Sequence, residues 1–259
     1  MPELPDLTVI SKNLNKRFAN KKVKHFEIFK YERVNASSEQ FKRELENQVL
    51  ESVDRSGKEL LLTFSNGAQL GIHLMLNGKI HLITERGVKN KIFEIVFDDE
   101  EGFSVSDISG LAKPTLNPSD SITPDALSDD FNFEYLKNIL KRSRTKIIKK
   151  ILTDQKVVRG IGNAYVDEIL WDAGVSPFSV GTKIPDEYVH KIIDSTKKIL
   201  LEAIEQIKAI EPEIISGEIR SFLKVHRPNK SHAPTGHPIK VDMSEGRKTY
   251  YTDEQLLFK

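Results

Sequence analysis

The chain has 259 residues, of which 38% are hydrophobic and 30% are charged. This composition can build a packed core and argues against wholesale disorder. The length suits one large domain or two ordinary ones, at roughly 100–200 residues per domain. The sequence contains no cysteine, which excludes disulfides, thiolate zinc sites, iron–sulfur clusters and a cysteine nucleophile.

The net charge of +1 does not by itself indicate a polyanionic partner, but the charges are unevenly distributed. Residues 137–150 hold seven Lys and Arg and no acidic residue, whereas residues 98–101 and 128–134 are acidic. A net charge near zero can conceal a basic face that is suited to nucleic acid. The same run is also typical of a solvated helix surface, so charge alone leaves both interpretations open.

The sequence shows no targeting or membrane signal. No apolar run approaches the roughly 20 residues that span a bilayer. Residues 1–10 lack the basic and apolar regions of a signal peptide. We therefore expect a cytoplasmic protein with no membrane partner.

The first part of the chain alternates between one helical pattern and many short strand patterns. Residues 6–19 have the apolar spacing of a helix. Short β-like runs follow, separated by turn dipeptides, at 23–29, 60–64, 69–76, 78–83 and 91–97. They predict an antiparallel sandwich or barrel with a helix at its start. Residues 113–130 carry Pro, Ser and Asp without periodicity and are interpreted as a connection.

Beyond this connection the pattern becomes helical and then returns to short strands. Helices are predicted at 131–140, 145–152, 166–173, 186–209 and 211–215. The helix over 186–209 has an apolar stripe, typical of a bundle helix buried on one side. Strands are predicted at 222–226, 237–241 and 247–251. The predicted fold class is therefore α+β in two lobes: an N-terminal antiparallel β-sandwich with an N-terminal helix, and a C-terminal helical lobe with a small β-hairpin.

The first residues suggest covalent chemistry. Removal of Met1 leaves the secondary amine of Pro2 at the N-terminus. An α-amino group has a pKa near 7.7–8.0, so a useful fraction is unprotonated at neutral pH. Such an amine can attack an aldehyde-like carbon and form an iminium link. Glu3 can move protons beside it if burial raises its pKa. Alone, this segment is equally well explained as a helix start.

Four segments together carry a family resemblance. The start, Pro2-Glu3-Leu4-Pro5-Asp6, resembles the start of the formamidopyrimidine-DNA glycosylase/endonuclease VIII family, whose members excise oxidised bases and cleave the abasic strand by elimination. Residues 152–177 resemble the family's helix–two-turns–helix signature and are the most specific match. Gly57-Lys58 resembles its hairpin lysine, and residues 245–255 resemble the end of its C-terminal zinc finger. The resemblance extends from Met1 to about Gln255.

The resemblance implies catalytic roles for three residues. Pro2 is the expected nucleophile at C1′ of the lesion sugar, and Glu3 the acid–base residue that helps to open the ribose ring. Lys58 is the expected phosphate-contacting or general-acid lysine. The alternative for Lys58 is an ordinary exposed lysine in a turn.

The resemblance also implies a DNA-backbone interface. Gly160 and Gly162 permit an unusual φ and a close approach in a tight turn, and Asn163 then begins a helix that can hold a phosphate. Lys149 is expected near Asn163 on the DNA backbone. Arg247 is expected to contact the phosphates that flank the flipped nucleotide, with a surface arginine as the alternative.

The finger departs from the family pattern because it has no cysteine. Its four ligand places hold His232, Thr235, Tyr251 and Glu254, which do not make the closed site that structural zinc needs. We therefore expect no metal and no other cofactor, as in members with a zincless finger. Packing by three aromatic residues is expected to replace the metal: Tyr250, Tyr251 and Phe222.

The side chains that fill the space left by a flipped base also differ. Leu76 stands at the methionine place of the family and Leu111 at the phenylalanine place, within residues 107–112. The arginine that recognises the orphaned cytosine is absent. The loop that covers a flipped purine is missing, because residues 216–222 run directly into 223–227. A preference for 8-oxoguanine opposite cytosine is therefore not expected, and the pattern is closer to endonuclease VIII.

The sequence thus predicts a base-excision repair enzyme, a bifunctional DNA glycosylase and abasic-site lyase. Its expected substrates are oxidised pyrimidines, formamidopyrimidines or abasic sites in double- or single-stranded DNA, which places it with the nucleoid. An abasic-site lyase with weak excision and a non-catalytic lesion-binding protein are the alternatives. We expect a monomer. The predicted domains are 1–115, a linker 116–130, the helix–two-turns–helix domain 131–222 and the finger hairpin 223–259.

Overall fold

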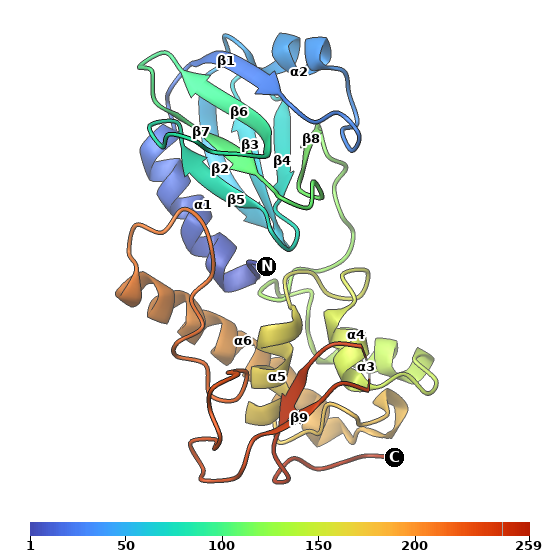
Figure 1. Ribbon diagram of the computed structural model, residues 1–259. Helices are drawn as coiled ribbons and strands as arrows, with labels where there is room; N and C mark the ends of the chain where they lie inside the picture. The colour runs from blue at the N-terminus through green and yellow to red at the C-terminus, as the bar shows by residue number, and fades with distance from the viewer. Residues whose placement is uncertain (245) are drawn as a thin grey trace. The chain divides into compact units, whose positions relative to one another are not determined.

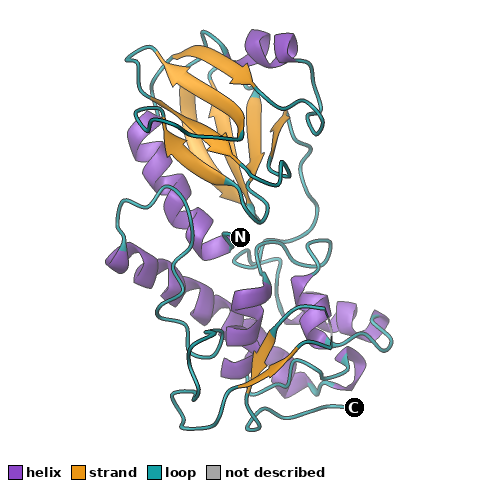
Figure 2. Cartoon of the chain, viewed as in Figure 1, coloured by secondary structure: helices purple, strands orange, loops and turns teal. Residues whose placement is uncertain are grey.

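The computed structural model describes residues 1–244 and 246–259. Glu245, at which the segment resembling the end of the finger begins, lies outside the described residues. The chain forms two compact units, Met1–Asp120 with Ile207–Glu218, and Ser121–Gln206 with Ile219–Lys259. Most strands belong to the first unit and most helices to the second (Figure 2).

The first unit contains two antiparallel four-stranded sheets and two helices, the first of which is α1 (Leu4–Phe18) (Figure 1). One sheet has the order β1 (Val23–Ile28), β6 (Lys91–Phe97), β7 (Gly102–Ser106), β5 (Lys79–Leu82). The other has the order β2 (Leu50–Ser56), β3 (Glu59–Phe64), β4 (Gln69–His73), β8 (Lys113–Leu116). The antiparallel β-lobe with a helix at its start is therefore confirmed.

A cluster of phenylalanines forms the core of this unit. Phe18 of α1 stacks on Phe97 of β6, with ring centroids 5.1 Å apart, and both side chains are fully buried. Phe26 of β1 stacks on Phe41 of helix α2 (Ser38–Leu45) at 5.4 Å. Aromatic pairs at such distances add to the free energy of burial, and here they fix both helices to the sheet that contains β1 and β6.

Four elements of this unit lie outside the predicted runs, namely α2, β2, β7 and β8. Helix α2 starts at a capping box, in which Ser37 accepts from the backbone N–H of Gln40 at 3.2 Å. Strand β8 falls within the predicted connection, where Pro114 pairs with Ile72. Proline has no N–H for the ladder, and β8 accommodates it because it is an edge strand.

The second unit is helical, with a two-stranded hairpin. Its helices are α3 (Phe133–Arg142), α4 (Ile148–Thr153), α5 (Asn163–Asp172) and α6 (Asp186–Ile210), with a 3₁₀ turn at Gly181–Lys183. The hairpin pairs β9 (Lys240–Asp242) with β10 (Thr249–Tyr251). The predicted apolar stripe of α6 is buried, including Ile192 and Leu200 at 0% exposure. The last turn of α6, from Ile207, belongs to the first unit.

Two sequence predictions for this part of the chain are wrong. Residues 211–215 are not helical, because Asn13 donates its side-chain amide to the carbonyls of Pro212 and Ile214 at 3.0 and 2.8 Å. Residues 222–226 are not a strand. The buried carboxylate of Glu168 instead accepts the backbone N–H groups of residues 224–226 at 2.7–2.8 Å.

Candidate functional site

The first unit contains a cavity of about 460 Å³ at the N-terminus of the chain. Its lining includes Met1, Pro2, Leu76, Ile108 and Glu218. The Met1 ammonium donates to Glu218 Oε2 at 2.8 Å, across a sequence separation of 217 residues. The start of the chain is therefore held inside a cavity, together with a carboxylate from the segment that follows α6.

Glu3, which follows Pro2 in the chain, is the N-cap residue of α1. It is only 4% exposed, and its backbone N–H donates to Asp6 Oδ2 at 2.8 Å. Pro2 is also buried. The helix cap thus fixes the position of the two residues from which chemistry is expected.

Lys58 occupies the two-residue turn between β2 and β3. Gly57 adopts φ +60°, which favours glycine in that turn. Arg55 donates to the Gly57 carbonyl at 3.1 Å and to Thr8 Oγ1 of α1 at 2.9 Å, so the turn is tied to the first helix. Lys58 is 8% exposed, which contradicts the alternative of an ordinary exposed turn lysine.

His73, which the sequence analysis did not assign to the site, lies within the electrostatic influence of Lys58. The pKa of His73 is lowered from 6.5 to about 4. Burial is the largest cause, and the positive charges of Lys113 and Lys58 contribute the rest. Its Nδ1 accepts the backbone N–H of Met75 at 3.0 Å. The imidazole is therefore neutral at neutral pH.

This depressed pKa predicts a loss of stability on acidification. The unfolded chain binds more protons than the folded chain between pH 6.5 and about 4, so His73 contributes stability above pH 6.5 that is lost as the pH falls through this window. The loss is roughly 3 kcal/mol at ~1.36 kcal/mol per pH unit. Urea unfolding of the parent chain and of His73→Asn, which keeps an acceptor for Met75, measures it. An equal loss in both proteins contradicts the assignment.

The two predicted space-filling residues differ in exposure. Leu76, in the turn between β4 and β5, is 63% exposed and lines the N-terminal cavity. Leu111 is only half-buried and does not appear in that lining. The neighbouring Ile108 is 79% exposed and does line the cavity.

The second unit contains a basic cavity of about 550 Å³, which brings together the three predicted backbone-contacting residues. Lys149 of α4, Asn163 at the start of α5 and Arg247 of the β9–β10 turn all line it, with Lys146 and Lys150. The N-terminal end of a helix dipole and four cationic side chains at one cavity favour an anion. The cavity also contains one acidic residue, Asp154.

Lys149 also has a structural role that its sequence context did not reveal. It is 6% exposed, and its Nζ pairs with Asp167 Oδ1 of α5 at 2.7 Å and donates to Thr249 Oγ1 of β10 at 2.9 Å. The other oxygen of Asp167 is bonded to His226 Nδ1 at 2.7 Å and accepts from Tyr250 N at 3.0 Å. This network joins α4, α5 and the hairpin.

Asn163 leaves one polar atom unused. Its Nδ2 donates to the Lys248 carbonyl at 3.0 Å, but its Oδ1 is buried and has no hydrogen-bond partner among the described residues. Such an atom costs about 1–3 kcal/mol. The preceding turn requires glycine, because Gly160 has φ +104° and donates to Gln155 Oε1 at 3.0 Å. The arrangement does not maximise the stability of the chain alone, as is typical of a binding position.

The finger is held by a carboxylate where the sequence places a former metal ligand. Glu254 Oε1 accepts from Trp171 Nε1 at 2.6 Å, Thr235 Oγ1 at 2.9 Å and Thr252 Oγ1 at 3.0 Å. Burial acts to raise the pKa of Glu254, but these three hydrogen bonds and the nearby charge of His237 lower it overall. Hydrogen bonds to a carboxylate therefore connect the turns that a metal ion connects in zinc fingers.

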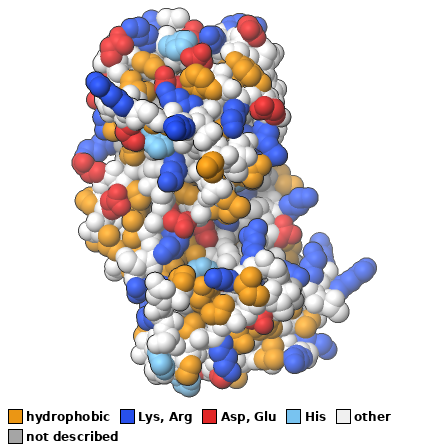
Figure 3. Space-filling view, in the orientation of Figure 1, with side chains coloured by type: hydrophobic (Ala, Val, Ile, Leu, Met, Phe, Trp, Pro, Cys, Tyr) orange, Lys and Arg blue, Asp and Glu red, His pale blue; other side chains and the backbone are white. Residues whose placement is uncertain are grey.

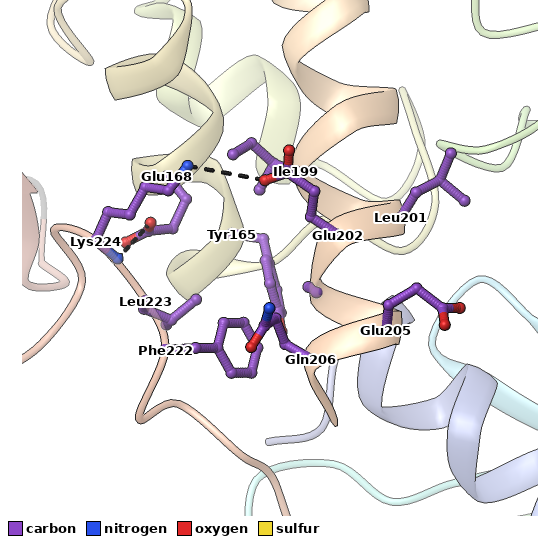
Figure 4. A pocket seen from close by; sticks show the side chains of 11 residues that line it. Tyr165, Glu168, Ile199, Leu201, Glu202, Glu205, Gln206, Phe222, Leu223 and Lys224 are labelled. Atoms are coloured by element: carbon purple, nitrogen blue, oxygen red, sulfur yellow. Dashed lines mark hydrogen bonds and ion pairs between the residues drawn. The ribbon is translucent and has the colours of Figure 1, made fainter. Parts of the chain in front are cut away.

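Aromatic packing of the hairpin agrees in part with the prediction. Tyr250 is 3% exposed, with its ring centroid 4.6 Å from that of His226. Tyr251 contacts Phe178 edge-on at 5.1 Å. Phe222 instead lines a separate cavity of about 510 Å³ beside Tyr165 of α5 (Figure 4).

That third cavity has an acidic edge. Glu202 and Glu205 of α6 line it, and Lys224 Nζ lies 3.8 Å from Glu202 Oε2 (Figure 4). Carboxylates in the lining of a cavity repel phosphate, so this cavity does not suit the DNA backbone.

Over the face seen in Figure 3, Lys and Arg are interspersed with Asp and Glu, so the basic character of the cavity beside Lys149 is local. Within the described residues, no helix has the length and apolar character needed to cross a membrane.

Comparisons with known proteins match nearly the whole chain to one protein family. A model described as "Formamidopyrimidine-DNA glycosylase N-terminal domain" matches residues 1–113, and one described as "Formamidopyrimidine-DNA glycosylase H2TH domain" matches residues 122–212. A formamidopyrimidine-DNA glycosylase of Carboxydothermus hydrogenoformans is 30% identical over 97% of this chain and 98% of its own length. That of Lactobacillus helveticus is 33% identical over 79% of this chain and 78% of its own length.

Comparison with solved structures points to the same family. A Lactococcus lactis Fpg in complex with abasic-site DNA has a TM-score of 0.86 at 25% identity and covers 97% of this chain and 98% of its own. A MutM in complex with DNA containing carbocyclic 8-oxo-G has a TM-score of 0.86 at 26% identity, over 98% and 100%. The fold, with its β-rich unit and helical unit, is therefore that of these DNA-bound proteins.

Proposed function

This chain belongs to the formamidopyrimidine-DNA glycosylase family, and on that premise we propose that it acts on lesion DNA through the N-terminal amine of Pro2. It is a base-excision repair DNA glycosylase. The observation that carries the proposed mechanism is the location of Pro2 in the lining of a cavity, next in the chain to the buried Glu3, whose backbone is fixed by the helix cap. An amine held in a cavity beside carboxylates is suited to covalent catalysis.

The proposed reaction has four stages: attack on C1′, opening of the sugar ring, elimination of the phosphates and hydrolysis. The lone pair of the Pro2 nitrogen forms a bond to C1′, and the base leaves with the electron pair of its C1′–N bond and takes up a proton. The nitrogen then loses its proton, and its lone pair breaks the C1′–O4′ bond; O4′ takes up a proton, the sugar ring opens and an iminium ion remains. Loss of the C2′ proton then expels the 3′ phosphate, and loss of a further proton expels the 5′ phosphate. Water hydrolyses the iminium and restores the amine.

Two residues are proposed to move protons in this sequence. Glu3, 4% exposed, is the proposed acid–base group at the ring oxygen. Lys58, 8% exposed and tied to α1 through Arg55, is the proposed general acid or phosphate contact. Glu218 supplies a further carboxylate, which pairs with the amine of Met1 while Met1 is present.

The proposed substrates are oxidised pyrimidines, formamidopyrimidines and abasic sites. Residues 107–112 contain no arginine to recognise an orphaned cytosine, so a preference for 8-oxoguanine opposite cytosine is not proposed. Double- and single-stranded DNA are both proposed partners, and the chain is proposed to act as a monomer associated with the nucleoid.

The basic cavity of the second unit is the proposed phosphate site, and salt dependence tests it. Arg247→Ala is expected to weaken duplex binding similarly for all sequences. It should reduce the slope of log K against log salt by about 1, because one phosphate contact is lost. Binding measured by fluorescence anisotropy over a series of salt concentrations reports the slope. Arg43→Ala removes an arginine that is 71% exposed on α2 and is expected to leave the slope unchanged. Equal slopes in all three proteins contradict the assignment.

Borohydride trapping tests the proposed function. Untagged protein is incubated with one oligonucleotide that carries an abasic site and one that carries an oxidised pyrimidine. Covalent adducts with both support the bifunctional enzyme, and an adduct with the abasic site alone indicates a lyase with weak excision. Tight binding without any adduct, from protein whose Pro2 amine is verified by mass spectrometry, overturns catalysis and leaves a lesion-binding protein.

A further inference from the structure

Three side chains of the first unit, Ser106, His81 and Glu85, form a hydrogen-bonded triad. His81 Nε2 lies 2.9 Å from Ser106 Oγ, and His81 Nδ1 lies 2.8 Å from Glu85 Oε2. The order of groups is that of serine–histidine–carboxylate triads, in which the imidazole takes the proton of the hydroxyl. The sequence analysis did not assign these residues to the site, because Ser106 is separated from His81 by 25 positions and the three form no continuous motif.

The pairing of β5 with β7 brings the histidine and the serine together. His81 of β5 pairs with Ser104, two residues before Ser106 at the end of β7. His81 and Ser106 are therefore diagonal neighbours on one face of the sheet, within reach of a long side chain. The turn after β5 positions the carboxylate, because Glu85 Oε1 accepts the N–H of Leu82 at 3.1 Å and the N–H of Glu85 donates to the Leu82 carbonyl at 3.0 Å.

The carboxylate determines the direction of the hydrogen bonds in the triad. The hydrogen bond with His81 is the largest cause that holds the pKa of Glu85 below its ordinary value, so this carboxylate is ionised at neutral pH and can only accept. Nδ1 of His81 therefore carries the hydrogen that Glu85 accepts. In the neutral imidazole Nε2 is then an acceptor, and the Ser106 hydroxyl donates to it. The remaining function of Ser106 Oγ is that of an acceptor, through its lone pairs.

One end of the triad lines the N-terminal cavity and the other end reaches solvent. Ser106 is 8% exposed and lines the same cavity as Pro2. The side chains of His81 and Glu85 are 21% and 50% exposed. A proton taken up at the Ser106 hydroxyl can therefore leave the cavity for water through the imidazole.

We propose that the triad takes up the proton that the Pro2 nitrogen loses after its bond to C1′ has formed. The inference rests on the proposed function. Ser106 Oγ accepts this proton while its own proton passes to His81 Nε2, and the imidazolium, stabilised by Glu85, then releases a proton to water. Glu3 is the proposed proton donor to O4′ in the same stage. Two protons move in opposite directions there, so a second group is needed as the acceptor.

Chemical rescue by free imidazole tests this role. His81→Ala is expected to slow single-turnover cleavage of an abasic-site duplex by about a hundredfold, within the usual contribution of a positioned base. Added imidazole should restore at least about a tenth of the lost rate, with imidazole alone as the blank. Ser106→Ala should be slowed without being restored, because the group that lines the cavity is then missing. Cleavage by His81→Ala at the parent rate, or a loss that imidazole does not restore, overturns the proposal.

His25→Ala is the matched control. His25 also lies beside two carboxylates, with Nδ1 3.2 Å from Glu46 Oε1 and Nε2 3.6 Å from Glu27 Oε2, but it does not line the N-terminal cavity. This variant should cleave like the parent chain, with or without imidazole. The affinity of every variant for the duplex, measured by fluorescence anisotropy, should stay within about twofold of the parent, because the triad acts on a proton and not on the DNA backbone. Stimulation of His25→Ala by imidazole to the same degree as His81→Ala refutes a specific role.

Two results separate failure of this inference from failure of the proposed function. If the parent chain forms no covalent adduct, the proposed function fails. If the parent chain forms the adduct and His81→Ala cleaves as fast, the function stands and the triad is not the acceptor, which leaves Glu218 in the same cavity. Nitrogen-15 NMR of the free protein gives an independent reading. A hydrogen on Nδ1 with Nε2 unprotonated is expected for His81, and a hydrogen on Nε2 refutes the relay, because Nε2 could not then take the Ser106 proton.

Discussion

Replacing Pro2 with glycine is expected to reduce the yield of borohydride-trapped adduct on abasic DNA by about a hundredfold. Glycine keeps a terminal amine but loses the ring that fixes its direction, and a misplacement of about 1 Å at a reacting atom costs a factor of this size. Protein that retains Met1 should give no adduct, because the Pro2 nitrogen is then an amide without a nucleophilic lone pair. Mass spectrometry of each preparation identifies the terminal residue.

Two further variants help to interpret the trapping yield of Pro2→Gly. Pro234→Gly changes an exposed proline in the finger and should trap as well as the parent chain. Glu3→Gln should slow the reaction by about 10²–10⁴-fold, the contribution of a positioned acid or base, while leaving the amine intact. Adduct of normal yield from protein with a verified Met1 would show that another amine is the nucleophile, and the candidates are then the Met1 amine, which lies in the same cavity, and Lys58.

Asp167→Ala is expected to lower the free energy of unfolding of the second unit by about 3–5 kcal/mol, the usual cost of removing one partner of a buried ion pair. Asp167 is fully buried, and Lys149, with a side chain 7% exposed, loses its counterion. Tyr250 N–H and His226 Nδ1 lose their partner as well. The single tryptophan, Trp171, lies in the same helix α5, so its fluorescence during urea unfolding follows this unit.

Matched variants separate the ion pair from general effects of removing an aspartate. Asp129→Ala removes a fully exposed carboxylate 3.5 Å from Lys197, and should cost no more than about 1 kcal/mol. The double variant Lys149→Met/Asp167→Leu removes both buried charges and should recover most of the stability. If Asp167→Ala costs no more than Asp129→Ala, the network does not hold the hairpin to the helices.

Several features of this protein follow from the sequence by itself. The apolar stripe of α6, the short strands between turn dipeptides and the cap at Glu3 depend on neighbours within a few residues, where periodicity and turn chemistry act. The similarity of residues 1–6 and 152–177 to one family was visible for the same reason, since each motif is continuous in the chain. Pro2, Glu3 and Asn163 can therefore be identified from these continuous motifs alone.

Other features were decided only by tertiary structure, because their partners are distant in sequence. Residues 222–226 have a strand-like pattern, but Glu168, more than fifty residues earlier, takes their N–H groups. Lys149 belongs to a basic run, yet Asp167 and Thr249 bury its ammonium. The exposure of Ile108 in place of Leu111 depends on which N–H groups meet the buried Asp107 carboxylate. Burial and hydrogen-bond partners are properties of the folded chain, and no local pattern contains them.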